Sequence, residues 1–334
     1  MKGNRKYLSE HSVNLYSNRW LMFPAHQIST AHTDDPEIQE VINNSHIYLI
    51  CKRPSCFFVP ESLSFDGQAI SATLAYRING AIVERPFKMP FNPPEGMETL
   101  RISDYPHRDI NTYDRNGQEL VHVPATVVAT DPPVVSDATL HNLEVLYVGQ
   151  SFGDGTRNSL ERLKSHSTLQ KILADMQHSY PDDEALLLTF EYCPYRVVSS
   201  FDGVDKNIQE KDGDAERFAS ILDNPLSKKQ QISLAEAGLI RYFQPLYNEV
   251  YKESFPASDQ KVLNQCYTLD FSGLIVEINT DELGLQLWSP TVKSNDHHIG
   301  MFNLYKVDER RSFFSFIKGD GSTFEFPDVT QPTK

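Results

Sequence analysis

A change of hydrophobic period between residues 146 and 166 constrains the fold of this chain more than any other feature. The sequence LYVGQS has the pattern of a buried strand, and the residues after it follow a helical pattern that ends in RLKSH. A loop containing Gly149, Gly153 and Gly155 joins the two patterns. Side chains alternate with a period of two in strands and repeat every 3.6 residues in helices. The stretch therefore predicts a strand–loop–helix unit in the middle of the chain.

Strand patterns dominate on both sides of this unit. Alternating side chains flank Asn79-Gly80, a pair that favours a type I′ hairpin turn, and short strand patterns return after about residue 262. We therefore predict an α+β fold with a β-rich N-terminal domain over residues 1–130 and an α/β domain over 131–252. An acidic, Gly-containing excursion near 201–231 interrupts the α/β domain. The β-rich C-terminal region, 253–334, either packs with the N-terminal domain or forms a separate module.

Composition narrows the classes of protein that fit the sequence. The chain has 334 residues, 40% of them hydrophobic and 23% charged, as in ordinary globular proteins. Its formal net charge of −14 does not attract polyanions, so nucleic-acid binding would require a local basic surface. No apolar run approaches the roughly 20 residues of a membrane helix, and the N-terminal residues do not resemble a signal peptide. We expect a cytoplasmic protein without a membrane segment.

A second group of polar residues lies in the stretch LAEAGLIRYFQPLYNE. Glu236 is predicted in the first turn of a helix that Ser233 opens, and Asn248 follows the helix stop at Pro245. Together with the central unit, this stretch gives a fixed order of candidate site residues along the chain: Tyr147, Gly149, Arg162, His166, Glu236 and Asn248.

This order resembles the GIY-YIG nuclease superfamily. LYVGQS is similar to the second signature of that family, RLKSH to its arginine helix, and AEAGLIRYFQPLYN to its glutamate helix. The resemblance covers residues 140–250, about a third of the chain. The first signature, Gly-Ile-Tyr, has no counterpart, since no tyrosine lies between Tyr113 and Tyr147. The loop between Gly149 and Arg162 is also longer than in compact members.

The resemblance implies a divalent-metal-dependent endonuclease that cuts nucleic acid, DNA rather than RNA. Glu236 would hold Mg²⁺ or Mn²⁺, and Arg162 would present its fork of donors to phosphate. Arg162 and His166, four residues apart, would share one helix face, and His166 or Tyr147 would take the proton of the attacking water. Members of this superfamily act in restriction, repair and mobile elements, which suggests bacterial defence or DNA processing.

The remaining two residues would support this chemistry. Gly149 would let the strand end approach the substrate closely, because glycine has no side chain. Asn248 would orient Glu236 or close the loop around it.

Each residue also has a purely structural interpretation. Glu236 lies three residues after Ser233, so it could form a capping box. Arg162 and His166 could be an exposed helix face, Tyr147 a core residue, and Asn248 a turn residue. For the whole chain, the alternatives are a GIY-YIG-like module that binds nucleic acid or protein without catalysis, and an interaction protein whose β-rich regions bind a protein partner.

Overall fold

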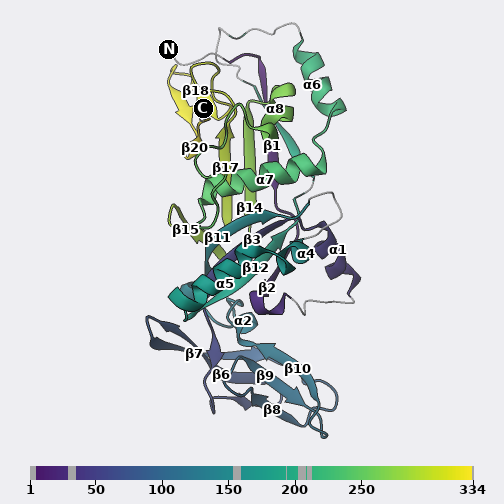
Figure 1. The fold of residues 1–334 in the computed structure, drawn as a ribbon, viewed down its shortest axis with the longest axis vertical. Coiled ribbons are helices and arrows are strands. Elements are labelled where there is room, and N and C mark those ends of the chain that lie inside the picture. The colour runs from purple at the N-terminus through teal and green to yellow at the C-terminus, as the bar shows by residue number, and fades with distance from the viewer. Residues whose placement is uncertain are drawn as a thin grey trace.

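The computed structural model describes residues 5–28, 35–152, 159–192, 194–201, 208 and 213–332. Helices and mixed sheets are combined in one chain, which confirms the predicted α+β class. Figure 1 shows three sheet-containing regions following one another along the long axis of the molecule, with the N- and C-terminal ends close together at one end. The candidate site residues belong to the middle region.

The middle region is built on a six-stranded sheet. Its spatial order is β16 (Val292–Asn295), β15 (Gln286–Ser289), β11 (Asn142–Gln150), β3 (Ile47–Pro54), β12 (Asp183–Phe190) and β2 (Trp20–Pro24). Strand β3 is antiparallel to both β11 and β12, and β15 is parallel to β11. The apolar runs of β3 and β12 are buried almost throughout, as expected of strands covered on both faces.

Helices cover the two faces of this sheet (Figure 1). Helices α4 (Ser159–Lys164) and α5 (Ser167–Ser179) place Leu163, Leu169 and Ile172 in one core cluster with side chains of β3 and β12. Helix α7 (Lys228–Phe243) contributes to the core on the other face. Ser227 and Gln230 form a reciprocal capping box at its start, so the helix begins six residues before the predicted Ser233.

Helix α7 lies between the middle sheet and a second, five-stranded sheet (Figure 1). Glycine at position 238 permits the close approach to this second sheet, since an added Cβ would lie 2.6 Å from the Val276 side chain. The sheet order is β13 (Arg196–Phe201), β1 (Ser9–Tyr16), β14 (Gly273–Asn279), β17 (His297–Asn303) and β20 (Val329–Thr330). Strand β1 is parallel to β14, so segments from the two ends of the chain share one sheet.

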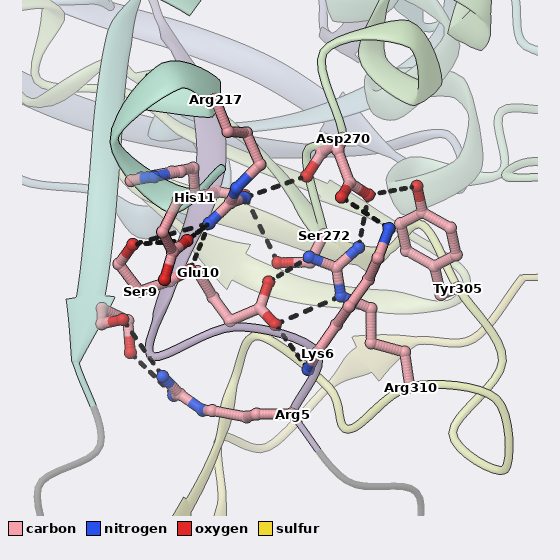
Figure 2. Close-up of polar contacts among 12 residues, drawn as sticks. Arg5, Lys6, Ser9, Glu10, His11, Arg217, Asp270, Ser272, Tyr305 and Arg310 are labelled. Carbon is pink, nitrogen blue, oxygen red and sulfur yellow. Dashed lines mark hydrogen bonds and ion pairs between the residues drawn. The ribbon is translucent and has the colours of Figure 1, made fainter. Parts of the chain in front are cut away.

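Buried ion pairs fasten these two ends together (Figure 2). The Arg310 guanidinium donates to both carboxylate oxygens of Glu10, whose side chain is fully buried, and to Asp270 at 2.6 Å. Lys6 and Tyr305 also donate to Asp270, at 2.8 and 2.9 Å. A buried carboxylate is tolerated only when it is paired, so Glu10 depends on Arg310.

The third region is an insertion between β3 and β11 (Figure 1). It has its own core and comprises β4 (Phe57–Phe58), β5 (Ser64–Phe65), β6 (Ala69–Ile78), β7 (Ala81–Pro90), β8 (Thr99–Ile102), β9 (Asp109–Tyr113), β10 (Glu119–Pro124), α2 (Ala125–Val128) and α3 (Ala138–His141). The predicted hairpin is formed by β6 and β7. Asn79 and Gly80 have φ values of 51° and 79°, as a type I′ turn requires.

The remaining elements are short or peripheral. They are η1 (Ala25–Gln27), α1 (Pro36–Asn44), α6 (Asp214–Asp223), η2 (Lys261–Leu263), α8 (Asn264–Thr268), η3 (Asp281–Leu283), β18 (Ser315–Ile317) and β19 (Thr323–Glu325). Helix α6 occupies part of the predicted acidic excursion near 201–231, and residues 202–207 and 209–212 of that excursion lie outside the described residues.

Strand pairing does not follow the predicted division of the chain at residue 130. Strand β3, which the prediction assigned to the N-terminal domain, lies between β11 and β12 in the middle sheet. Strands β15 and β16, assigned to the C-terminal region, extend the same sheet. The division was wrong because it followed changes of pattern along the chain, whereas sheets join strands that are distant in sequence.

Candidate active site

Two tyrosines from neighbouring strands form the centre of the site. Tyr147 on β11 and Tyr48 on β3 have ring centroids 6.2 Å apart, and Gly149 pairs directly with Tyr48 across the two strands. A Cβ at Gly149 would lie 2.6 Å from the phenol end of Tyr48 and 2.7 Å from the Tyr147 ring. Glycine is therefore required at 149 to admit the two rings. This is a different reason from the predicted close approach of substrate.

His166 holds Tyr48 in position from the other side. Helix α4 ends at Lys164, and His166 is the N-cap of α5, where its Nδ1 accepts a hydrogen bond from Leu169 N at 3.2 Å. A neutral imidazole that accepts at Nδ1 carries its proton on Nε2, so Nε2–H donates to the Tyr48 hydroxyl at 3.2 Å. Burial and then the charge of Arg162 lower the pKa of His166, which favours this neutral form.

The predicted shared helix face of Arg162 and His166 is therefore wrong. The chain turns between them, because His166 uses its side chain to cap the second helix. Arg162 is exposed at the end of α4, whereas His166 is buried. The two residues still interact, and the positive charge of Arg162 also favours the ionised forms of Tyr48, Tyr147 and Glu236. The guanidinium of Arg162 thus brings positive charge close to these three side chains.

Glu236 reaches the site from the middle of α7. The helix begins at Lys228, so Glu236 is two turns inside it and is not a capping residue. Its carboxylate accepts a hydrogen bond of 2.6 Å from Nε2 of Gln150 at the end of β11, and the Ser233 hydroxyl lies 3.5 Å from Oε1 of Gln150. Burial raises the pKa of Glu236 to about 7, against the opposing effects of Gln150 and Arg162. The carboxyl group can therefore gain or lose its proton near neutral pH.

Asn248 ties the loop after α7 to β11. Its side-chain oxygen accepts from Val148 N at 2.9 Å, and its side-chain nitrogen donates to Val148 O at 2.9 Å. Both bonds are buried, so Asn248 fixes the loop against the strand that carries Tyr147. Of the two predicted roles, loop closure matches these contacts, because both hydrogen-bonding groups of the side chain are engaged by Val148.

A cavity of about 680 Å³ adjoins part of this group of residues. Its wall includes Tyr147, Glu236 and Asn248, together with residues of α5 and of the loop after α7, but not Tyr48, Arg162 or His166. Within the described ranges, no three His, Cys, Asp or Glu side chains are grouped so that they could hold a metal ion. Mg²⁺ is commonly bound through one or two carboxylates, with water and substrate phosphate as its other ligands, so a single carboxylate such as Glu236 is compatible with a bound cation.

Two residues of this site, Tyr48 and Gln150, were not predicted from the sequence. The first tyrosine was expected between Tyr113 and Tyr147, whereas Tyr48 lies before the insertion, in the strand pattern HIYLICK. The signal that could have found it is a buried strand with a tyrosine near its start. Gln150 is the residue after Gly149, and only the packing of α7 reveals its contact with Glu236.

Comparison of the chain with protein-family models, with curated proteins and with solved structures finds no match. Among the residues that the structure describes, no helix has both the length and the apolar character needed to cross a membrane. A function can therefore be inferred only from the geometry of the site and from the resemblance of its residues to the GIY-YIG nucleases.

Proposed function

We propose that the chain is a divalent-metal-dependent nuclease that hydrolyses phosphodiester bonds of nucleic acid, with DNA as the preferred substrate. The observation that supports this best is the convergence of Tyr48, Tyr147, Arg162, His166 and Glu236. Their ring contacts, hydrogen bonds and electrostatic interactions join four separate segments of the chain. Tyr147 and Glu236 also line the cavity, and ionisable groups with perturbed pKa values beside a cavity are typical of catalytic sites.

Tyr48 also supports the proposed relationship to the GIY-YIG nucleases. The resemblance leaves the first tyrosine of the family without a counterpart between Tyr113 and Tyr147, and we propose Tyr48, on the strand β3 that pairs with β11, as that counterpart. The insertion between β3 and β11 separates the two tyrosines in sequence. On this reading, the chain is a member of the superfamily whose two signature strands are interrupted by an extra β-rich region.

The residues have distinct roles in the proposed reaction. Arg162 binds a non-bridging oxygen of the scissile phosphate and stabilises the charge that develops there. His166 donates a hydrogen bond from Nε2–H to the Tyr48 hydroxyl and accepts one at Nδ1 from Leu169 N. Because both ring nitrogens are engaged, His166 positions the phenol of Tyr48 and does not accept the proton of the attacking water. Tyr48, in its ionised form, takes that proton, and Tyr147 lies beside it.

Glu236 would hold the divalent cation in this reaction, with Gln150 fixing the orientation of its carboxylate. A bound cation supplies positive charge that stabilises the leaving oxygen and favours ionisation of nearby phenols. This charge is needed because burial raises the pKa of Tyr48 and opposes its ionisation in the free protein.

Nicking of supercoiled plasmid tests the proposal. Wild-type protein and Glu236→Ala are incubated with plasmid in Mg²⁺, in Mn²⁺ and in EDTA, and both are checked for folding by circular dichroism. We expect cation-dependent nicking by the wild type and its loss in Glu236→Ala. Glu253→Ala, which removes an exposed carboxylate outside the site, should retain the wild-type rate. Equal nicking by wild type and Glu236→Ala would reject Glu236 as the ligand, and an inactive wild type would favour the non-catalytic alternative.

A further inference from the structure

The loop that follows α7 places two aliphatic side chains in solvent at the mouth of the cavity. Leu246 is 64% exposed and Val250 is 66% exposed, and both contribute to the cavity wall that includes Tyr147 and Glu236. Single exposed aliphatic residues are common on protein surfaces. Two exposed aliphatic residues on one short loop, both lining the cavity of the candidate site, form a small apolar surface that a ligand in this cavity would contact.

Hydrogen bonds hold this loop in place at two positions between Leu246 and Val250. Asn248, between them, is bonded twice to Val148 on β11. Tyr247 donates its hydroxyl to Asp175 on α5 at 2.9 Å and its backbone N–H to Leu146 at 3.1 Å. Because the loop is fixed at these points, Leu246 and Val250 cannot fold inward without breaking buried bonds. Their exposure is a property of the folded chain.

The charges around the cavity do not favour contact with several consecutive phosphates of a nucleic-acid backbone. The described residues of its wall include Lys171 and three acids, Asp175, Glu236 and Glu249. Proteins that bind intact duplex gain most of their affinity from Lys and Arg on phosphates. The outer surface of a duplex also presents phosphate and sugar, with the bases stacked inside, so aliphatic side chains would gain little from it.

We propose that Leu246 and Val250 contact an unpaired nucleobase next to the scissile phosphate, so that the substrate is single-stranded or locally unpaired DNA. This inference rests on the proposed function and specifies its substrate class. An unstacked base presents an apolar face, which aliphatic and aromatic side chains can cover. Removal of a stacked aromatic side chain weakens binding about 10-fold or more, and we expect about 10-fold for the two smaller aliphatic side chains together.

Fluorescence anisotropy tests the inference without requiring catalysis. A labelled 20-nucleotide single strand and the matched duplex are titrated with wild-type protein in EDTA, in which cation-dependent cleavage cannot occur. We expect tighter binding of the single strand than of the duplex at the same salt concentration. The double variant Leu246→Ser/Val250→Ser should bind the single strand about 10-fold more weakly. Leu222→Ser, at a residue 60% exposed on α6, is the matched control and should bind as the wild type does.

The outcomes separate this inference from the proposed function. Equal binding of single strand and duplex, or equal binding by the loop variant and the control, overturns the inference even if the wild type nicks plasmid. Loss of single-strand binding in the loop variant alone supports the inference even if no cleavage is found, in which case the nuclease proposal fails. Because both loop residues are exposed, the serine variants should fold normally, and circular dichroism checks this.

Discussion

Gly149→Ala should disturb both stability and activity. An added methyl group would lie 2.6 Å from Cζ and Oη of Tyr48 and 2.7 Å from Cε1 of Tyr147. Tyr48 is only 1% exposed and is hydrogen-bonded to His166, so a shift of its ring would disturb a buried hydrogen bond. Overpacking of this kind costs about 1–3 kcal/mol.

Two measurements check this estimate. The first is the melting temperature. Because unfolding 334 residues releases about 2.1 cal/mol/K of entropy per residue, a loss of about 1–3 kcal/mol should lower Tm by roughly 1–4 °C. A ring displacement of about 1 Å should also reduce nicking about 100-fold. Gly319→Ala is the matched control, because no atom lies within 4 Å of a Cβ added there. If Gly149→Ala unfolds at the same temperature as Gly319→Ala, the close packing of the two tyrosines around Gly149 is refuted.

Three further predictions concern the ion pairs and the carboxylate. Glu10→Gln removes one of the two carboxylates that pair with the buried Arg310 guanidinium, and Asp270 remains as the other. The free energy of unfolding in urea denaturation should therefore fall by about 1.5–3 kcal/mol; an unchanged midpoint would contradict the stabilising role of this pair. Nicking should increase as pH rises through about 7, because Glu236 binds a cation only after losing its proton; a rate independent of pH between 6 and 8 would argue against Glu236 as ligand. Gln150→Ala removes a hydrogen-bond donor that lowers the pKa of Glu236, so the pH–rate profile of this variant should shift to higher pH. A shift to lower pH would contradict the role of Gln150 in positioning the Glu236 carboxylate.

The sequence was most informative where a residue acts within one element. The strand that carries Tyr147, the helix that carries Glu236 and the turn at Asn79-Gly80 all have local signatures, and the structure places each in the predicted type of element. Local signatures were less reliable at helix ends. Ser227 and Gln230 fit the capping-box pattern as well as Ser233 and Glu236 do, and only packing distinguishes the two.

Contacts between segments that are distant in the sequence could not be predicted from such local signatures. Tyr48 and His166 are 118 positions apart, and a whole β-rich insertion lies between Tyr48 and the strand it pairs with. His166 illustrates a different limit, since Ser167 and Gln170 also fit the pattern of a helix cap and predict a break one position later than the structure has it, at the N-cap His166. Strand register and helix packing set both features, and neither is encoded in a short motif.

In the proposed reaction, Tyr48, from the strand before the insertion, acts in one active site with Glu236. The rate of Mn²⁺-dependent plasmid nicking should be compared for wild type, Tyr48→Phe and Glu236→Gln. We expect the wild type to nick and each variant, with an unchanged circular dichroism spectrum, to lose at least about 100-fold in rate. Nicking by Tyr48→Phe at the wild-type rate would show that the Tyr48 hydroxyl takes no part in the reaction.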